Sequence, residues 1–271
     1  MQPGIAILDN SCYGFLEEPP PERAFRRNLR VADLVAYPSE VNLVEATAAP
    51  DGIRERLLGT ILRIGDGNPL LPWPFTLLKA IGQAILEGRT RFSLGPSGKE
   101  WYLEDLAAAR ALSAEVLAFQ QGIEETFSRF HVENRQKLRR RMKESGVRED
   151  FSSAREFIER VWTGSDTRRD FAEVTWRGLK LPGDAPVDIL ERNEAWRLLL
   201  DAEGVAIYER GVATAQPKKV QRLDLIQLVF LGGAPRRVVA TADKGFLRAA
   251  NCILEGRYPN ARAVDISDLV S

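Results

Sequence analysis

The feature that most constrains this chain is a junction near its C-terminal end, where a short apolar run meets a helical segment. Residues 238–242 are apolar and rich in β-branched side chains, which predicts a buried strand, and the residues after Asp243 have helical spacing. In an open parallel sheet, ligands bind at the carboxyl ends of the strands, so we expect the Asp243 carboxylate to face such a crevice. Thr241 stands two residues earlier, the spacing that places both side chains on one side of a strand.

Two further carboxylates stand in comparable settings in the N-terminal part of the chain. Asp9 ends another apolar run, residues 5–8. Glu45 follows a strand-like stretch, residues 34–37, and then Ser39, which we expect to cap a helix. Glu45 lies six residues after Ser39, nearly two turns into that helix. Both carboxylates are therefore expected close to the carboxyl ends of predicted strands.

A fourth carboxylate, Asp224, lies in a helical segment that is otherwise strongly apolar, residues 221–231. Such a pattern tolerates a charge only where the charge has a function or a partner. Carboxylates that converge repel one another, and one or more would stay protonated without a counter-charge. Mg²⁺ and Mn²⁺ prefer carboxylate oxygen, whereas the sequence has no cluster of Cys and His for zinc. A site for Mg²⁺ or Mn²⁺ is therefore expected if these acids meet.

The pattern as a whole resembles the acidic set of the PIN-domain nucleases: Asp9, Glu45, Asp224 and the Thr241-x-Asp243 pair. Residues 1–48 and those from about 216 to 271 carry the resemblance. The family usually has Asp, then a small hydroxyl residue, then Asn, whereas Asn10 and Ser11 stand here in the reverse order. The resemblance implies an α/β fold of three layers, α/β/α, with a central parallel sheet.

The resemblance also implies hydrolysis of phosphodiester bonds in RNA by a water that carboxylate-bound Mg²⁺ or Mn²⁺ activates. The implied catalytic and metal-binding residues are Asp9, Glu45, Asp224 and Asp243. We expect the two residues at strand ends to bind the metal directly, and the two on helices to complete the shell directly or through water. Ser11 and Thr241 would orient carboxylates or water, and Lys244 would contact phosphate.

Three of the four carboxylates also have a structural interpretation. An aspartate at a strand–helix junction commonly caps the helix, which applies to Asp9 and Asp243, and Asp224 could interact with a helix dipole. Phosphatases of the haloacid-dehalogenase type also have an Asp after their first strand, but they need a second Asp where this chain has Ser11. A third hypothesis is a PIN-like module without catalysis, which binds RNA or another protein.

The pattern of helices and turns predicts three parts: a first PIN-like part at residues 1–51, a mainly helical insertion or cap at 52–203, and a second PIN-like part at 204–271. The second part is expected to open with a strand, because residues 204–211 alternate roughly as a strand would. Helices are expected at residues 23–31, 53–64, 75–86, 101–145 and 193–201. The longest of these ends in a dense positive run, which predicts a solvated face or a nucleic-acid-binding arm.

Charge distribution limits how the protein could bind a polyanion. Lysine and arginine together number 38, as do aspartate and glutamate, so nucleic-acid binding must depend on local patches. One such patch is a helical face that carries Arg23, Arg26, Arg27 and Arg30. We interpret this face either as ordinary solvated surface or as a phosphate-contacting rim next to Asp9.

Cysteine content and hydropathy set the expected environment. The two cysteines, Cys12 and Cys252, argue against a disulfide framework and fit a reducing compartment, and Cys12 is expected to be a buried structural thiol. The chain has no basic leader and no apolar run of membrane length, so a cytoplasmic protein without a membrane partner is expected. RNA is the expected partner, with single-stranded DNA, a protein partner and a homo-oligomer as open alternatives.

Overall fold

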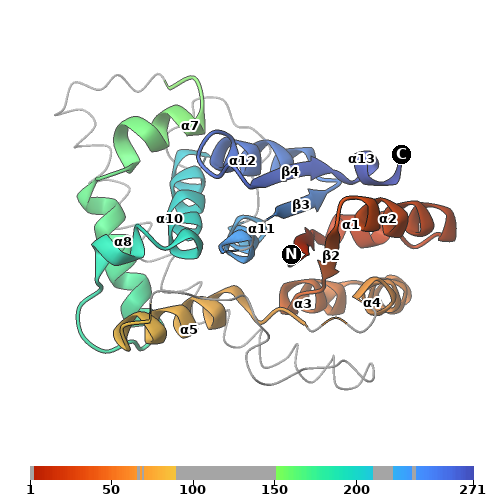
Figure 1. Ribbon diagram of the computed structural model, residues 1–271, viewed down its shortest axis with the longest axis horizontal. Helices are drawn as coiled ribbons and strands as arrows, with labels where there is room; N and C mark the ends of the chain where they lie inside the picture. The colour runs from red at the N-terminus through yellow and green to blue at the C-terminus, as the bar shows by residue number, and fades with distance from the viewer. Residues whose placement is uncertain (1–2, 66–67, 69, 90–150, 210–221, 234–235) are drawn as a thin grey trace.

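One parallel sheet organises the computed structural model, which describes residues 3–65, 68, 70–89, 151–209, 222–233 and 236–271 (Figure 1). Its four strands lie in the order β2-β1-β3-β4. They are β1 (Gly4–Leu8), β2 (Leu34–Tyr37), β3 (Arg237–Thr241) and β4 (Ala261–Asp265). The strands expected from the apolar runs at residues 5–8, 34–37 and 238–242 are thus confirmed, the last shifted by one residue.

Helices cover both faces of the sheet, because alternate strand residues contribute to two separate hydrophobic cores. Ile5, Ile7 and Val239 pack into one core, whereas Ala6 and Leu8 pack into the other. Strands buried on both faces read as continuous apolar runs, which is how these strands appear in the sequence. The expected α/β architecture with a central parallel sheet is confirmed.

The helices divide between these two cores. The core that contains Ala6 is completed by α1 (Asn10–Phe15), α2 (Pro19–Val31), α4 (Asp51–Gly65) and α13 (Ile266–Val270). The larger core, which contains Ile7, is completed by α5 (Pro74–Leu86), α7 (Ala154–Phe157), the π-helix η1 (Ile158–Trp162), α8 (Asp166–Gly178), α9 (Val187–Leu190), α10 (Glu194–Ile207), α11 (Arg222–Ile226), the 3₁₀ helix η3 (Gln227–Leu231) and α12 (Lys244–Leu254). The helix α3 (Glu40–Ala48) contributes to both cores.

Strand order places a topological switch point between β1 and β3. The chain passes from β1 outward to β2 through α1 and α2 on one face, and from β3 outward to β4 through α12 on the other. These connections step in opposite directions from the central pair, so the helices that follow β1 and β3 diverge. In open α/β sheets this divergence creates the crevice in which ligands bind, at the carboxyl ends of the strands.

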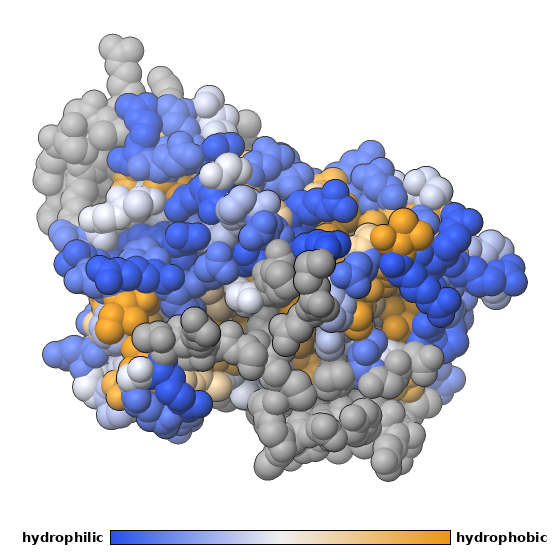
Figure 2. Space-filling model, viewed as in Figure 1, coloured by the Kyte–Doolittle hydropathy of each residue, from blue (hydrophilic) through white to orange (hydrophobic). Residues whose placement is uncertain are grey.

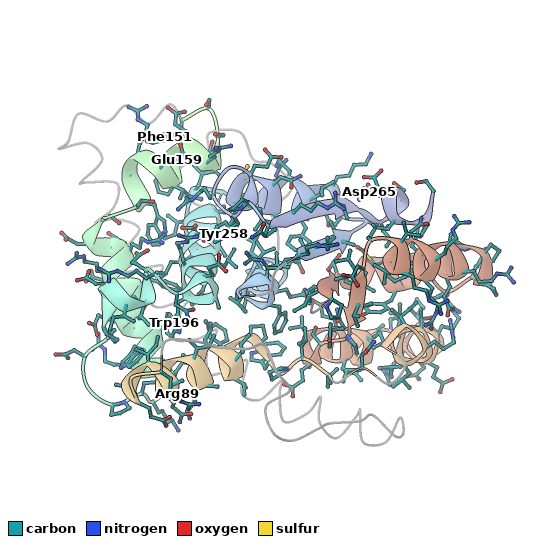
Figure 3. The ribbon with its side chains drawn as sticks, in the orientation of Figure 1. Arg89, Phe151, Glu159, Trp196, Tyr258 and Asp265 are labelled. Carbon is teal, nitrogen blue, oxygen red and sulfur yellow. The ribbon has the colours of Figure 1, made fainter. Side chains whose placement is uncertain are left out.

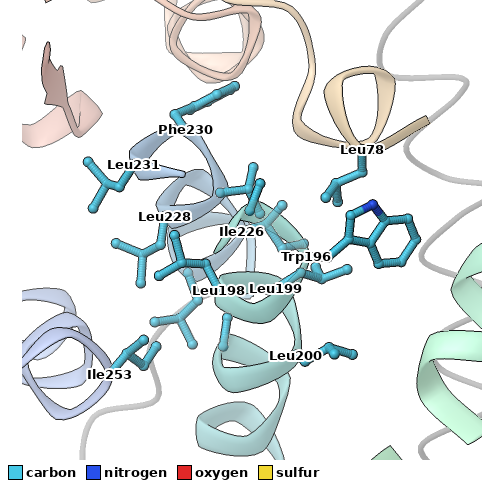
Figure 4. Close-up of a cluster of buried hydrophobic side chains, with 14 of the residues drawn as sticks. Leu78, Trp196, Leu198, Leu199, Leu200, Ile226, Leu228, Phe230, Leu231 and Ile253 are labelled. Atoms are coloured by element: carbon cyan, nitrogen blue, oxygen red, sulfur yellow. The ribbon is translucent and has the colours of Figure 1, made fainter. Parts of the chain in front are cut away.

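The larger core joins the helical layer to the sheet. Figure 4 shows α10 packed against α11 and η3 through Leu198, Ile226 and Leu228, with Leu78 of α5 against Trp196. The indole rings of Trp176 and Trp196 lie 6.0 Å apart between their centroids. None of the described helices is both long enough and apolar enough to cross a membrane.

Most helices occur where the sequence predicts them. The helices expected at residues 53–64, 75–86 and 193–201 are found as α4, α5 and α10, with extensions at their ends. The helix α2 begins at Pro19, four residues before the expected start at Arg23, because a proline is well accommodated in the first helical turn. The helix expected at residues 101–145 and its positive run lie outside the described residues.

The strand expected at residues 204–211 is wrong, because α10 continues through Gly204 to Ile207. A short apolar run fits a buried strand and a buried helix equally well, and here the run is buried as part of a helix. Gly204 allows a close approach, since a Cβ at this position would lie 2.6 Å from Cδ1 of Trp162. The indole of Trp162 is itself fixed by a 2.7 Å hydrogen bond from its Nε1 to the Leu200 carbonyl.

We expect Gly204→Ala to destabilise the protein by about 1–3 kcal/mol, the usual cost of overfilling a packed core. Helix propensity alone would favour alanine by roughly 0.8 kcal/mol, so the sign of the effect reports the clash. The control is Gly178→Ala at the last position of α8, where an added Cβ meets nothing within 4 Å. Urea denaturation of both variants gives the comparison, and a Gly204→Ala protein as stable as the wild type would contradict the close contact.

Candidate active site at the carboxyl ends of the strands

Asp9 stands at the switch point, directly after β1. Its backbone nitrogen donates to the Ala240 carbonyl at 2.9 Å, which fixes Asp9 beside the end of β3. Its carboxylate oxygen Oδ2 accepts hydrogen bonds from the hydroxyl of Ser11 at 2.5 Å and from the hydroxyl of Thr241 at 2.9 Å. The carboxylate is therefore held between two strand ends by side chains that are far apart in the sequence.

The two hydroxyls also bind the backbone that follows β3. The Ser11 hydroxyl accepts from the Ala242 nitrogen at 2.9 Å, and the Thr241 hydroxyl accepts from the Asp243 nitrogen at 2.9 Å. Each hydroxyl thus accepts one bond and donates its proton to Asp9, a complete arrangement for a hydroxyl group. Asn10, on the other hand, has a buried side-chain oxygen without a hydrogen-bond partner among the described residues.

Asp243 is exposed and caps α12. Its Oδ1 accepts from the backbone nitrogens of Gly245 at 2.6 Å and Phe246 at 3.1 Å. Asp9 is likewise the N-cap of α1, with a longer bond of 3.4 Å from the Ser11 nitrogen. The capping interpretation of both residues is therefore realised in the structure, and capping by one oxygen is compatible with a second role for the carboxylate.

Glu45, on α3, interacts electrostatically both with Asp224 on α11 and with Asp9 at the end of β1. Burial raises the pKa of Glu45, and the charges of Asp224 and then Asp9 raise it further, to about 8. The side chains of Glu45, Asp224 and Asp9 therefore lie close enough to act on one another. Asp243 is not among the charges that act on Glu45. The structure thus brings three of the four expected acids, Glu45, Asp224 and Asp9, into one electrostatic group. The fourth, Asp243, is joined to Asp9 through the Thr241 hydroxyl, which accepts a hydrogen bond from the Asp243 nitrogen and donates one to Asp9.

The position of α3 depends on Asn42, which sequence analysis missed. Ser39 and Asn42 form a capping box at the start of α3, which confirms Ser39 as the helix cap. The side-chain nitrogen of Asn42 donates to the carbonyl of Leu8 at 2.9 Å, next to Asp9. Asn42 therefore ties the helix that carries Glu45 to the end of β1. The three-residue spacing from Ser39 was the signal that could have identified it.

Glu40, in the first turn of α3, has a structural role. Its carboxylate is buried and accepts a hydrogen bond from the backbone nitrogen of Trp73 at 2.7 Å. Burial raises the pKa of Glu40, and the bond from Trp73 partly offsets this effect. The carboxylate thus fixes the segment that leads into α5.

Lys244 is exposed at the start of α12, and its positive charge acts on Asp265 at the end of β4. Figure 3 labels Asp265. Two hydrogen bonds from Ser267 lower the pKa of Asp265, and the charge of Lys244 adds to this effect. Asp265 is another strand-end carboxylate, which sequence analysis missed. It caps α13 and lies one strand beyond the pair that carries Asp9 and Thr241.

Cys12 is a buried thiol beneath the site, as expected. Its sulfur donates to the Ala240 carbonyl at 3.1 Å. Burial raises the pKa of the Cys12 thiol well above its usual value, and the charge of Asp9 raises it further. A thiol held in its protonated form is a poor nucleophile, so Cys12 serves packing.

The chemistry of the donor set fits a hard divalent cation. Glu45, Asp224 and Asp9 offer carboxylate oxygen, and their mutual repulsion is what a divalent cation would offset. Within the described part of the chain, no group of three or more His, Cys, Asp or Glu side chains has the arrangement of a metal site. Comparisons of the chain with protein-family models, curated proteins and solved structures found no match.

Proposed function

We propose that this protein is a metal-dependent nuclease with a PIN-like α/β/α fold, which hydrolyses phosphodiester bonds in RNA. The observation that carries the proposal is the electrostatic group of Glu45, Asp224 and Asp9 at the carboxyl ends of the central strands. A partly buried cluster of carboxylates is costly, and such clusters occur where a site needs them. The order of these acids along the chain and the Thr241-x-Asp243 pair support the choice of this enzyme class.

When bound, Mg²⁺ or Mn²⁺ would lower the pKa of a water and offset charge on the phosphodiester. Asp9, Glu45, Asp224 and Asp243 are the residues that would hold the ion. Ser11 and Thr241 hold Oδ2 of Asp9 by two donated hydrogen bonds, which fixes the orientation of the carboxylate. Burial and the charges of Asp224 and Asp9 raise the pKa of Glu45 to about 8 in the metal-free protein, and a bound cation would offset this effect.

The test is an Mn²⁺ titration by calorimetry, combined with cleavage of a fluorescent single-stranded RNA by the same samples. We compare the wild type with the double variant Asp9→Asn/Asp243→Asn. Asparagine caps helices about as well as aspartate, so the fold is expected to survive while two ligand charges are lost. We expect Mn²⁺ binding and cleavage in the wild type and neither in the double variant. Asp188→Asn is the control, because Asp188 is exposed on α9.

Wild-type protein that neither binds Mn²⁺ nor cleaves RNA would refute the nuclease proposal. That outcome would favour the second candidate, a PIN-like module that binds RNA or protein without catalysis. One observation supports this alternative: the Oδ1 atom of Asp243 accepts the two backbone hydrogen bonds that cap α12. Single-stranded DNA in the same cleavage assay tests the choice of RNA.

A further inference from the structure

The outer face of α2 carries an arginine stripe, which we define as Arg23, Arg27 and Arg30. These three side chains are exposed, and none of them forms an ion pair with a carboxylate of the described residues. Their spacings of four and three residues place them on one face of the helix, along about 10 Å of its length. The stripe is therefore an uncompensated positive surface on a chain whose net charge is zero.

Neighbouring arginines extend this positive surface. Arg26 and Arg63 share a single carboxylate, that of Glu22, at 3.0 and 3.2 Å. Arg26 also donates to the carbonyl of Arg63, which joins α2 to the end of α4. The two cations neutralise Glu22 and leave one positive charge in excess. Figure 2 shows strongly hydrophilic side chains over the end of the molecule that α2 forms.

Along the chain, one exposed aromatic residue stands between Asp9 and the stripe. Phe15, the last residue of α1, has an aromatic side chain that is 42% exposed. Asp9 caps the other end of α1, a helix about 9 Å long. Aromatic rings that stack on bases, combined with cations that follow the backbone, are the features by which proteins bind single-stranded nucleic acid.

We propose that single-stranded RNA binds across α1 and α2, with its backbone along the arginine stripe and a base stacked on Phe15, and reaches the carboxylates from this side. The choice of RNA rests on the proposed nuclease function. The surface itself rests on the exposure and charge of α2. The proposed RNA-binding surface therefore runs from Arg30 along α2 and α1 toward Asp9.

The experiment measures binding of a fluorescein-labelled single-stranded RNA by anisotropy, in an Asp9→Asn background that prevents cleavage. The stripe variant is Arg23→Gln/Arg27→Gln/Arg30→Gln. Its control is Arg169→Gln/Arg177→Gln/Arg192→Gln, which removes as many exposed arginines from the helical layer at the opposite end of the molecule (Figure 1). Each protein is titrated at several salt concentrations.

Loss of three phosphate contacts is expected to reduce the slope of log affinity against log salt by about 2 and to weaken binding up to roughly 100-fold at 0.1 M salt. The control should bind as the background protein does. Phe15→Ser should weaken binding at least about fivefold without a change in slope, since stacking releases no counterions.

Equal affinity and salt slope in the stripe variant and its control would overturn the proposed path, as would wild-type protein that binds no RNA. Weaker binding with a smaller slope supports the path even if the wild type cleaves nothing, and in that case only the nuclease function fails. Duplex RNA that binds as tightly as the single strand, with Phe15→Ser unchanged, would overturn the single-stranded assignment.

Discussion

Metal-free Glu45→Gln protein is expected to be more stable than the wild type by about 2 kcal/mol at pH 7. Burial and the charges of Asp224 and Asp9 raise the pKa of Glu45 from 4.5 to about 8 in the folded protein. Each pH unit between these values is worth about 1.4 kcal/mol, which gives roughly 3 kcal/mol at pH 7. Partial exposure of Glu45 reduces this to the smaller figure, because water lessens the cost of burying the charge and screens part of the repulsion. Glutamine keeps the shape and removes the charge.

The direction in which the free energy of unfolding changes with pH follows from proton binding. Because the folded protein holds the Glu45 proton more tightly than the unfolded chain, the wild type loses stability as pH rises from about 4.5 to about 8. Urea denaturation between pH 5 and pH 8.5 should therefore give a falling free energy of unfolding for the wild type and a flatter profile for Glu45→Gln.

The control for this series is Glu87→Gln, at a glutamate whose side chain is 61% exposed. It should leave both the stability and its dependence on pH unchanged. Parallel profiles for the wild type and Glu45→Gln would show that neither burial nor the charges of Asp224 and Asp9 raise the pKa of Glu45. That result would remove the main support for a common acidic site.

Local sequence signals identified the parts of the fold that depend on neighbouring residues. Apolar runs bounded by capping residues predicted β1, β2 and β3, and Ser39 marked the start of α3. The same signals failed at residues 204–211, because an apolar run has no periodicity that separates a buried helix from a strand. In the structure α10 continues there, and its Gly204 packs against Trp162, a residue far away in the sequence.

Local sequence signals likewise predicted some residues of the candidate site but not the contacts between them. Strand–helix junctions identified Asp9 and Asp243, and helical position identified Glu45. The sequence could not show that Ser11 and Thr241 meet on one oxygen of Asp9, since that contact depends on the pairing of β1 with β3. Asn42 was missed because its two functions, capping α3 and holding β1, are apparent only when both elements are in place.

A buried ionic network joins the helical layer to the segment between α12 and β4. At its centre is Asp201 of α10, whose side chain has no exposed surface. Arg168 of α8 donates to Asp201 at 2.7 Å and forms a bidentate pair with Glu191. Arg257 lies 3.1 Å from the same carboxylate, and the hydroxyl of Tyr258 donates to it at 2.9 Å (Figure 3). Burial alone would lower the pKa of Arg168, but Glu191 and Asp201 hold it above its usual value.

Asp201→Asn is expected to destabilise the protein by about 3–5 kcal/mol, because it removes the charge partner of Arg257 and one of the two charge partners of the buried Arg168. The carboxamide has the same size, so the loss reports charge and hydrogen bonding and not a cavity. Asp188→Asn is the matched control: Asp188 lies 3.9 Å from Arg169, and both side chains are more than half exposed. An exposed pair of this kind is worth less than about 1 kcal/mol.

Because Arg257 and Tyr258 precede β4, loss of Asp201 should also weaken protection of the β4 amides from hydrogen exchange. Similar denaturation midpoints for the two variants would show that apolar packing alone holds the helical layer on the sheet.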